Sequence, residues 1–378
     1  MQQIAMSWLI YSMTKSPLIM GVIMFASCIP SLFVSPFAGV LIDRVNKFKA
    51  MILIQTIFMI GAFVLAGLTL TGVVQVWHIV ILSILMGVTN AIDIPLRQSF
   101  VVQLIDDPRD LSNAISLNSS SFNLARLIGP AIAGILIASA GEGICFLSNA
   151  ISYIAVIWAL FLMKVNARPN RKSTKNTMIS EFKEGFKYVW ESVQIRSIIL
   201  YLGITCLIGM SYPVIMPVFV KEVLHGGADT LGFLMSSSGI GALIGALYLA
   251  GRKSIKGLEK WVCIASLSMA LGLMGLSFTS SILISMCLTF FTGIGMVVII
   301  AACNTMVQHL VDDDKRGRVM SIYTMAFMGT APIGSLCGGA IAQKIGVAHT
   351  FLITGLTLVV AALIFSTKLK YFYAVNNP

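Results

Sequence analysis

The sequence has few charged residues. Asp, Glu, Lys and Arg make up 11% of its 378 residues, whereas 57% are hydrophobic. A water-soluble domain carries roughly 25% charged residues, so this chain cannot cover the surface of a soluble fold of its size. The scarcity of charge excludes a soluble enzyme, a disordered chain and a nucleic-acid-binding domain. Because the apolar residues form long blocks rather than an alternating pattern, an outer-membrane β-barrel is excluded as well.

Motifs for metal binding, nucleotide binding and catalysis are also missing. The seven cysteines stand singly in apolar runs, without a CxxC pair or a His/Cys cluster at ligand spacing. Residues 251–254 (GRKS) resemble part of a phosphate-binding loop but lack its preceding glycine turn. We therefore expect no metal, no other cofactor and no enzymatic activity, and we expect an ion gradient rather than ATP to supply energy.

The apolar blocks predict membrane-spanning helices, each of which needs about 20 apolar residues to cross the hydrocarbon core. Five windows lie in the first half and six in the second: 18–42, 50–72, 77–104, 114–139, 143–164, then 197–220, 229–251, 259–279, 281–307, 318–343 and 347–367. The apolar segment 1–14 is too short to span and lacks the features of a signal peptide. We expect it to be the second part of a first helix, inside which the chain starts; the alternative is a short re-entrant segment.

These windows predict an all-α membrane protein with two six-helix bundles and a truncated helix 1. The expected parts are an N-terminal bundle (1–164, part of helix 1 and helices 2–6), a linker (165–196), a C-terminal bundle (197–370, helices 7–12) and a tail (371–378). Within the linker, Phe182, Phe186 and Trp190 share one face at helical spacing. This pattern favours an interfacial helix on the inner leaflet, with a solvated flexible linker as the alternative.

Basic residues gather in alternate loops of this topology. One set contains Arg44 and Lys47, the basic linker and the tail, whereas the opposite loops hold only Lys15, Lys221 and Lys344. The positive-inside rule places the first set in the cytoplasm, so the linker and the C-terminus are expected to be cytoplasmic. The net charge of +11 then faces anionic lipid, and no nucleic-acid partner is expected.

The two halves of the sequence repeat one another at an offset of about 200 residues. In each half an acidic loop (106–107 or 312–314) leads into a polar helix start and then into a proline with nearby glycines, at Gly129-Pro130 or at Pro332-Ile333-Gly334. Two related six-helix halves are typical of transporters, in which the substrate site lies near the bilayer midplane between the repeats.

At this point the sequence resembles the major facilitator superfamily. Residues 39–47 (GVLIDRVNK) resemble its loop 2–3 signature, in which a glycine is followed four residues later by Asp-Arg and then by basic residues. Asn46 replaces the usual glycine and can also take a positive φ. Gly129-Pro130 resembles the antiporter signature of drug exporters, whereas the arginine usual before a helix-4 glycine is replaced by Ser83 ahead of Gly87.

Further motifs resemble the bacterial branch that contains enterobactin exporters and macrolide efflux proteins. They are residues 93–98 (DIPLRQ), the pair at 129–130 and residues 316–321 (RGRVMS). The resemblance implies a 12-helix fold in the bacterial cytoplasmic membrane and proton-coupled efflux of a small amphipathic compound such as a drug, macrolide or siderophore. It also implies a gate at the loop 2–3 signature, formed by Gly39, Asp43, Arg44 and Lys47; the alternative is that these charges only mark the topology beside the bilayer.

Charged residues within the predicted spans are the first candidates for mechanism. A charge at the centre of a span costs roughly 2.5–3.5 kcal/mol on insertion scales, so it usually faces a cavity or a partner. Asp93 and Arg97 are four residues apart and can pair along one helix, and Arg126 lies near mid-depth of the next span. We expect Asp93 to be the proton-carrying carboxylate and Arg126 its partner or a substrate contact; the alternative is a static ion pair.

Kinks and a substrate cavity complete the expectations. The helix-bending candidates are Pro95, Gly129, Pro130 and Pro332. The polar and aromatic residues expected to line a cavity are Trp8, Tyr11, Asn90, Asn118, Asn123, Tyr212, Asn304 and Tyr323.

The sequence thus predicts a monomeric secondary transporter whose partners are a small-molecule substrate, protons and the lipid bilayer. A metabolite importer or facilitator, a lipid flippase with the same bundle, and a non-transporting scaffold remain as alternatives.

Overall fold

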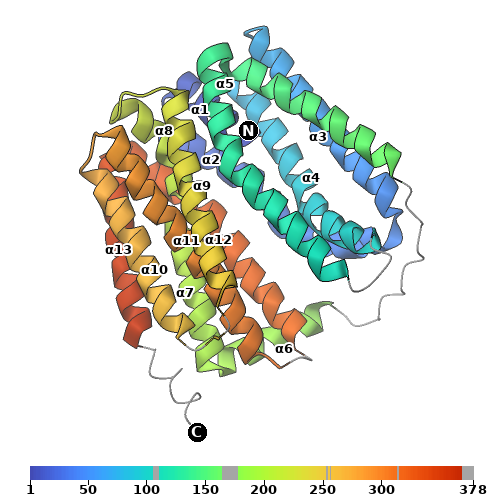
Figure 1. Cartoon of the computed structure of the whole chain (residues 1–378), viewed down its shortest axis with the longest axis vertical. Coiled ribbons are helices and arrows are strands. Elements are labelled where there is room, and N and C mark those ends of the chain that lie inside the picture. The colour runs from blue at the N-terminus through green and yellow to red at the C-terminus, as the bar shows by residue number, and fades with distance from the viewer. Residues whose placement is uncertain (105–109, 164–177, 253, 256, 313–314, 368–378) are drawn as a thin grey trace. The chain divides into compact units, whose positions relative to one another are not determined.

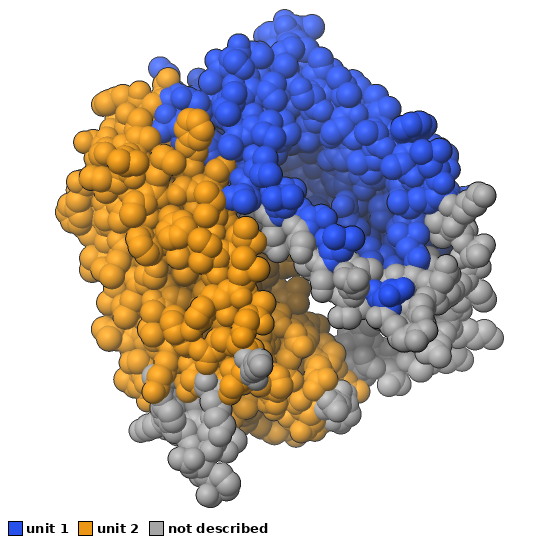
Figure 2. All heavy atoms as spheres, in the orientation of Figure 1, with its two compact units in different colours: residues 1–15, 22–174, 227–232 blue, residues 16–21, 175–226, 233–378 orange. Residues whose placement is uncertain are grey.

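The computed structural model describes residues 1–104, 110–163, 178–252, 254–255, 257–312 and 315–367 (Figure 1). Within these ranges some side chains of the second, fourth, fifth and sixth helices are not described, among them those at 39, 43–44, 123 and 126. The described residues form helices and connecting turns, without a strand. The chain forms two compact units, which Figure 2 colours separately.

Unit 1 contains Met1–Lys15, Val22–Thr174 and Gly227–Gly232. Its helices are α1 (Gln2–Thr14), most of α2 (Pro17–Arg44), α3 (Lys47–Leu70), α4 (Val76–Gln103) and α5 (Leu111–Leu162). The 52 residues of α5 cover two of the predicted windows, because the backbone leaves helical geometry only at Gly141. The expected loop between those windows is therefore a single-residue break.

Unit 2 contains Ser16–Gly21, Lys175–Gly226 and Phe233–Pro378. Its helices are α6 (Met178–Glu191), α7 (Val193–Gly209), α8 (Tyr212–Glu222), most of α9 (Ala228–Ala250), α10 (Leu258–Ser277), α11 (Ile282–Leu310), α12 (Arg316–Ile345) and α13 (Val347–Thr367). The window predicted at 197–220 is divided into α7 and α8, since Pro213 in the first turn of α8 cannot continue the hydrogen bonding of α7.

Length and composition make nine stretches of the described residues suitable for crossing a membrane. Together with α1, the apolar start of α2 and the division of α5 at Gly141, they account for two successive sets of six helices. The helix order predicted from the apolar windows is therefore confirmed.

A close crossing of glycine over a serine carbonyl occurs in both units. In unit 1 a Cβ added at Gly87 of α4 would overlap the backbone carbonyl of Ser27 on α2. In unit 2 a Cβ added at Gly293 of α11 would overlap the carbonyl of Ser238 on α9. Small residues allow backbones in a membrane to approach this closely, and the sequence positions match the predicted repeat.

Turn geometry repeats as well. Gly141, between the two parts of α5, and Gly346, between α12 and α13, have φ of 82° and 82°. This region of backbone space is open to glycine and costly for other residues. Each unit thus reverses its last pair of spans on a left-handed glycine.

Helix α6 packs against the start of α12 within unit 2. Arg318 forms an ion pair with Glu184 at 2.7 Å, and the Tyr188 hydroxyl donates to a carboxylate oxygen of Asp312 at 3.1 Å. Phe186 and Trp190 stack on each other with ring centroids 5.9 Å apart, and both are about half exposed. The predicted amphipathic pattern at the end of the linker therefore forms a helix with an exposed aromatic face.

The crossing at Gly87 gives a stability prediction. Gly87→Ala should destabilise the protein by about 1–3 kcal/mol, the usual cost of overpacking a tight contact, because the new methyl group overlaps the Ser27 carbonyl. Gly67→Ala on α3 is the matched control, since nothing lies within 4 Å of its added Cβ and alanine favours helix. Thermal melting in detergent measures both; equal melting temperatures for the two variants would contradict the crossing.

Candidate functional site

A buried carboxylate on α4 is the centre of the candidate site. Asp93 lies in unit 1 and is 5% exposed. It belongs to the span Val76–Val101, so it sits in a helix that has the length and hydropathy of a membrane crossing. Because a charge in such a helix is expensive without a partner, the groups around Asp93 decide what it can do.

Two side chains contact the Asp93 carboxylate, one on each oxygen. The Arg97 guanidinium lies 2.8 Å from Oδ2, one helical turn further along α4. The Gln55 amide on α3 donates to Oδ1 at 3.1 Å. Gln55 is 3% exposed, whereas the Arg97 side chain is 51% exposed. The carboxylate therefore has one fixed, buried partner and one partner that reaches open space.

A third helix completes the surroundings of this group. Tyr153 on α5 stacks on Phe58 of α3, with ring centroids 5.9 Å apart and planes at 14°. Its hydroxyl interacts with the Asn149 side chain and lies within electrostatic range of Asp93 and Arg97. Polar groups of α3, α4 and α5 thus meet inside unit 1.

Helix α1 extends the polar cluster. The Asn149 amide donates to the Gln2 side-chain oxygen at 2.7 Å, and the Gln2 amide contacts the Met86 sulfur on α4 at 3.0 Å. We call Gln2, Gln55, Asp93, Arg97, Asn149 and Tyr153 the polar cluster of unit 1. It contains one carboxylate, with amide and hydroxyl groups around it that can hold it in place.

Comparison with known proteins identifies the family. The model of a family described as "Transmembrane secretion effector" matches residues 1–377. The staphyloferrin A transporter of Staphylococcus aureus is 30% identical, over 99% of this chain and 94% of its own length. The multidrug efflux pump Tap of Mycolicibacterium fortuitum is 21% identical, over 99% of this chain and 93% of its own length.

This chain belongs to the transmembrane secretion effector family of major facilitator transporters. It is a multi-pass membrane protein with the 12-helix major facilitator fold, and its relatives transport small molecules. The resemblance stated from sequence motifs is therefore confirmed.

Solved structures agree on the fold. The nucleoside transporter NupG superposes with a TM-score of 0.73 at 14% identity, covering 98% of this chain and 97% of its own. A bacterial homologue of the iron transporter ferroportin, in an inward-facing state, gives 0.72 at 15% identity, covering 97% and 95%.

The loop 2–3 signature of this family member lies between α2 and α3. The side chains of Gly39, Asp43 and Arg44 lie outside the described residues, whereas Lys47 is the first residue of α3. Asn46 does not use the left-handed conformation that a glycine replacement would permit. Its φ is −69°, and its side chain accepts a hydrogen bond from the Lys49 N–H at 3.1 Å. Asn46 is an N-cap, which explains why asparagine suits this position.

Other predicted residues are placed as follows. The side chains of Arg126 and Asn123 lie outside the described residues, so the expected pairing of Arg126 with Asp93 stays a prediction. Pro95, Pro130 and Pro332 lie inside α4, α5 and α12, with Gly129 beside Pro130, and none of these helices is interrupted at its proline.

The residues predicted to line a cavity fall into different environments. Tyr11, Tyr212 and Tyr323 are buried, and the last two bond within unit 2, to the Ser238 hydroxyl and to the Ile300 carbonyl, both at 2.7 Å. Trp8 and Asn304 are half-buried, and Asn90 and Asn118 are exposed. The two unit 2 tyrosines are therefore engaged in packing contacts of their own unit.

Sequence reasoning found Asp93 and Arg97 but missed Gln55, Tyr153 and Asn149. Each of the three lies in an apolar run where a single polar residue is unremarkable by itself. Gln55 could have been singled out as the one amide side chain in the window 50–72, because a polar group in a membrane helix needs a partner.

The Gln55 contact gives a second stability prediction. Gln55→Leu should cost about 1–3 kcal/mol, because it leaves one buried Asp93 oxygen without a hydrogen bond. In an Asp93→Leu background the same change should cost much less, since the acceptor is gone. Gln308→Leu, at an exposed position on α11, is the control and should stay within about 0.5 kcal/mol. Unfolding in detergent measures all variants; an additive double variant would refute the contact.

Proposed function

We propose that this chain exports a small amphipathic compound across the bacterial cytoplasmic membrane, in exchange for protons and by alternating access. The observation that carries the proposal is the buried Asp93 carboxylate, held by Gln55 and paired with the half-exposed Arg97. An ion pair with one accessible partner can be broken and remade, whereas a fully enclosed pair is a structural unit.

The relatives favour a siderophore or a drug-like compound as substrate. One relative is a staphyloferrin A transporter and others are multidrug efflux pumps. The description of the matching family, "Transmembrane secretion effector", names secretion. The runner-up is import or facilitated uptake of a metabolite, because the structural neighbours include a nucleoside transporter and a xylose transporter. We further propose that the transporter acts as a monomer.

Orientation follows from the basic residues. The linker and the loop that contains Lys47 belong to the basic set of loops, and basic loops stay on the cytoplasmic side. We expect green fluorescent protein fused after Pro378 to fluoresce and alkaline phosphatase fused there to be inactive, since the latter folds only outside the cytoplasm. Active phosphatase at this position would reverse the proposed orientation.

The loop 2–3 residues complete the proposal as a gate. Asp43 and Arg44 end α2, and the adjoining Ile42 is buried with Met51 and Phe100 in the apolar core of this end of unit 1. This apolar core beside the end of α2 would hold the charged gate residues in a defined position.

Transport in inverted vesicles distinguishes the proposed proton coupling at Asp93 from the proposed gate at Asp43. Asp93→Asn should lower the rate of proton-driven uptake of a siderophore or dye into inverted vesicles at least tenfold below that of the parent. The same variant should still exchange labelled for unlabelled substrate, because only the proton step needs the carboxylate. Asp43→Asn should slow both processes, because a gate serves every transport cycle. Asp110→Asn, at an exposed position, is the control. Full proton-driven uptake by Asp93→Asn would overturn the coupling.

A further inference from the structure

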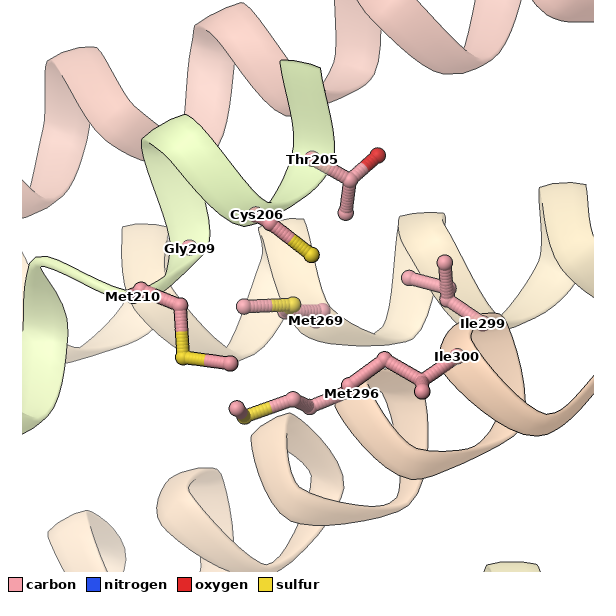
Figure 3. A pocket seen from close by; sticks show the side chains of 8 residues that line it. All are labelled: Thr205, Cys206, Gly209, Met210, Met269, Met296, Ile299 and Ile300. Atoms are coloured by element: carbon pink, nitrogen blue, oxygen red, sulfur yellow. The ribbon is translucent and has the colours of Figure 1, made fainter. Parts of the chain in front are cut away.

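Unit 2 contains a small pocket with an unusual concentration of sulfur. Its lining includes Cys206 and Met210 from the end of α7, Met269 from α10 and Met296 from α11. The other lining residues are apolar or small, such as Ile299 and Gly209. Figure 3 shows the four sulfur-containing side chains extending toward one another from these three helices.

The pocket is small and partly open, and Met210 at its edge is half-buried. Its volume is about 10 Å³, close to the roughly 10–15 Å³ that one water molecule needs. Cys206 and Met269 are almost fully buried, at 3% and 1% exposed. The space therefore admits one small atom or ion and excludes an organic ligand.

The ligand set defines the chemistry of an occupant. Thioether and thiolate sulfurs are soft ligands that select Cu(I) over the hard cations Mg²⁺ and Ca²⁺, which require oxygen ligands. No cluster of three His, Cys, Asp or Glu residues occurs among the described residues, so a harder metal has no comparable site there. Cys303, fully buried one turn beyond Ile299 on α11, lies within electrostatic range of Cys206 and adds a further sulfur nearby.

We propose that Cys206, Met210, Met269 and Met296 bind one soft monovalent metal ion, Cu(I) or Ag(I). Coordination by Cys206 replaces its thiol proton, which passes to solvent, and the three thioethers bind through sulfur lone pairs without a change in protonation. The ion ties α7, α10 and α11 together inside unit 2. The site is independent of the proposed transport function, since it lies in a different unit from Asp93 and its occupancy is measured without transport.

Silver(I) is the probe of choice because it does not change oxidation state during the measurement. The purified full chain is prepared with the exposed cysteines removed by Cys287→Ser and Cys337→Ser, loaded with silver nitrate in chloride-free detergent buffer, and passed over a desalting column. We expect about one retained silver per chain by elemental analysis, and a higher melting temperature in its presence, because ligand binding stabilises the folded state.

Substitutions in the pocket test the ligand assignment. Met210→Leu, Met269→Leu and Met296→Leu conserve volume and should keep the fold, yet each should weaken silver retention at least tenfold against a competing chelator. Cys206→Ser should weaken it most. Met325→Leu, at an exposed position on α12, is the matched control and should bind as the parent does.

Three results would overturn the site. The first is that the double-serine parent retains no silver. The second is that silver retention is unchanged in all three single methionine variants that remain folded. The third is that Met325→Leu loses as much silver as the pocket variants do. The first would mean that the thioethers only fill space in an apolar core, and the other two that silver binds elsewhere on the protein. Because the methionine variants are made singly, one misfolded variant leaves the remaining two to decide the outcome.

Discussion

The hydrocarbon core of a bilayer supplies no hydrogen bonds, and this constraint governs the whole molecule. A backbone amide or polar side chain within a span is therefore costly unless it finds a partner inside the protein, and among the described buried hydroxyls only those of Ser236 and Ser285 lack one. Helices meet the requirement for the backbone, and hydroxyl groups meet it by bonding back along their own helix, as Thr205 does to the Tyr201 carbonyl and Thr354 to the Thr350 carbonyl. Asp93 obeys the same rule at greater cost, because a carboxylate needs partners from other residues and receives them from Gln55 and Arg97.

Where polar contacts are scarce, close contact between backbones takes their place. The crossings at Gly87 and Gly293 put glycine against a serine carbonyl in both units, so the two halves share one packing device. The residues that follow the crossing glycine differ between the two units. Six residues after Gly87 stands Asp93, and six residues after Gly293 stands Ile299 in the sulfur-lined pocket. The same position of the repeat is therefore ionic in unit 1 and apolar in unit 2.

The helix order followed from the sequence because long apolar blocks have a single low-energy solution in a membrane. The pairing of Asp93 with Arg97 was also accessible, since both lie on one helix at a fixed spacing of four residues. The contact of Gln55 with Asp93, the place of Tyr153 beside it and the sulfur pocket were not accessible, because each depends on which faces of separate helices meet. The role of Asn46 was not accessible for a related reason: asparagine can replace glycine at a positive φ, but here the helix that follows uses its side chain as a cap.

The two partners of Asp93 respond differently to a proton. The Gln55 amide can donate to a carboxylate oxygen whether the group is charged or neutral, so this contact survives protonation and keeps the side chain in place. The ion pair with Arg97 loses most of its electrostatic attraction when the carboxylate is neutral. Because the Arg97 side chain is half exposed, its guanidinium can turn to other anionic or polar groups without leaving a buried charge unpaired. In the proton coupling that we propose, Gln55 would thus fix the position of the carboxylate, and Arg97 would convert its protonation into a change of contacts.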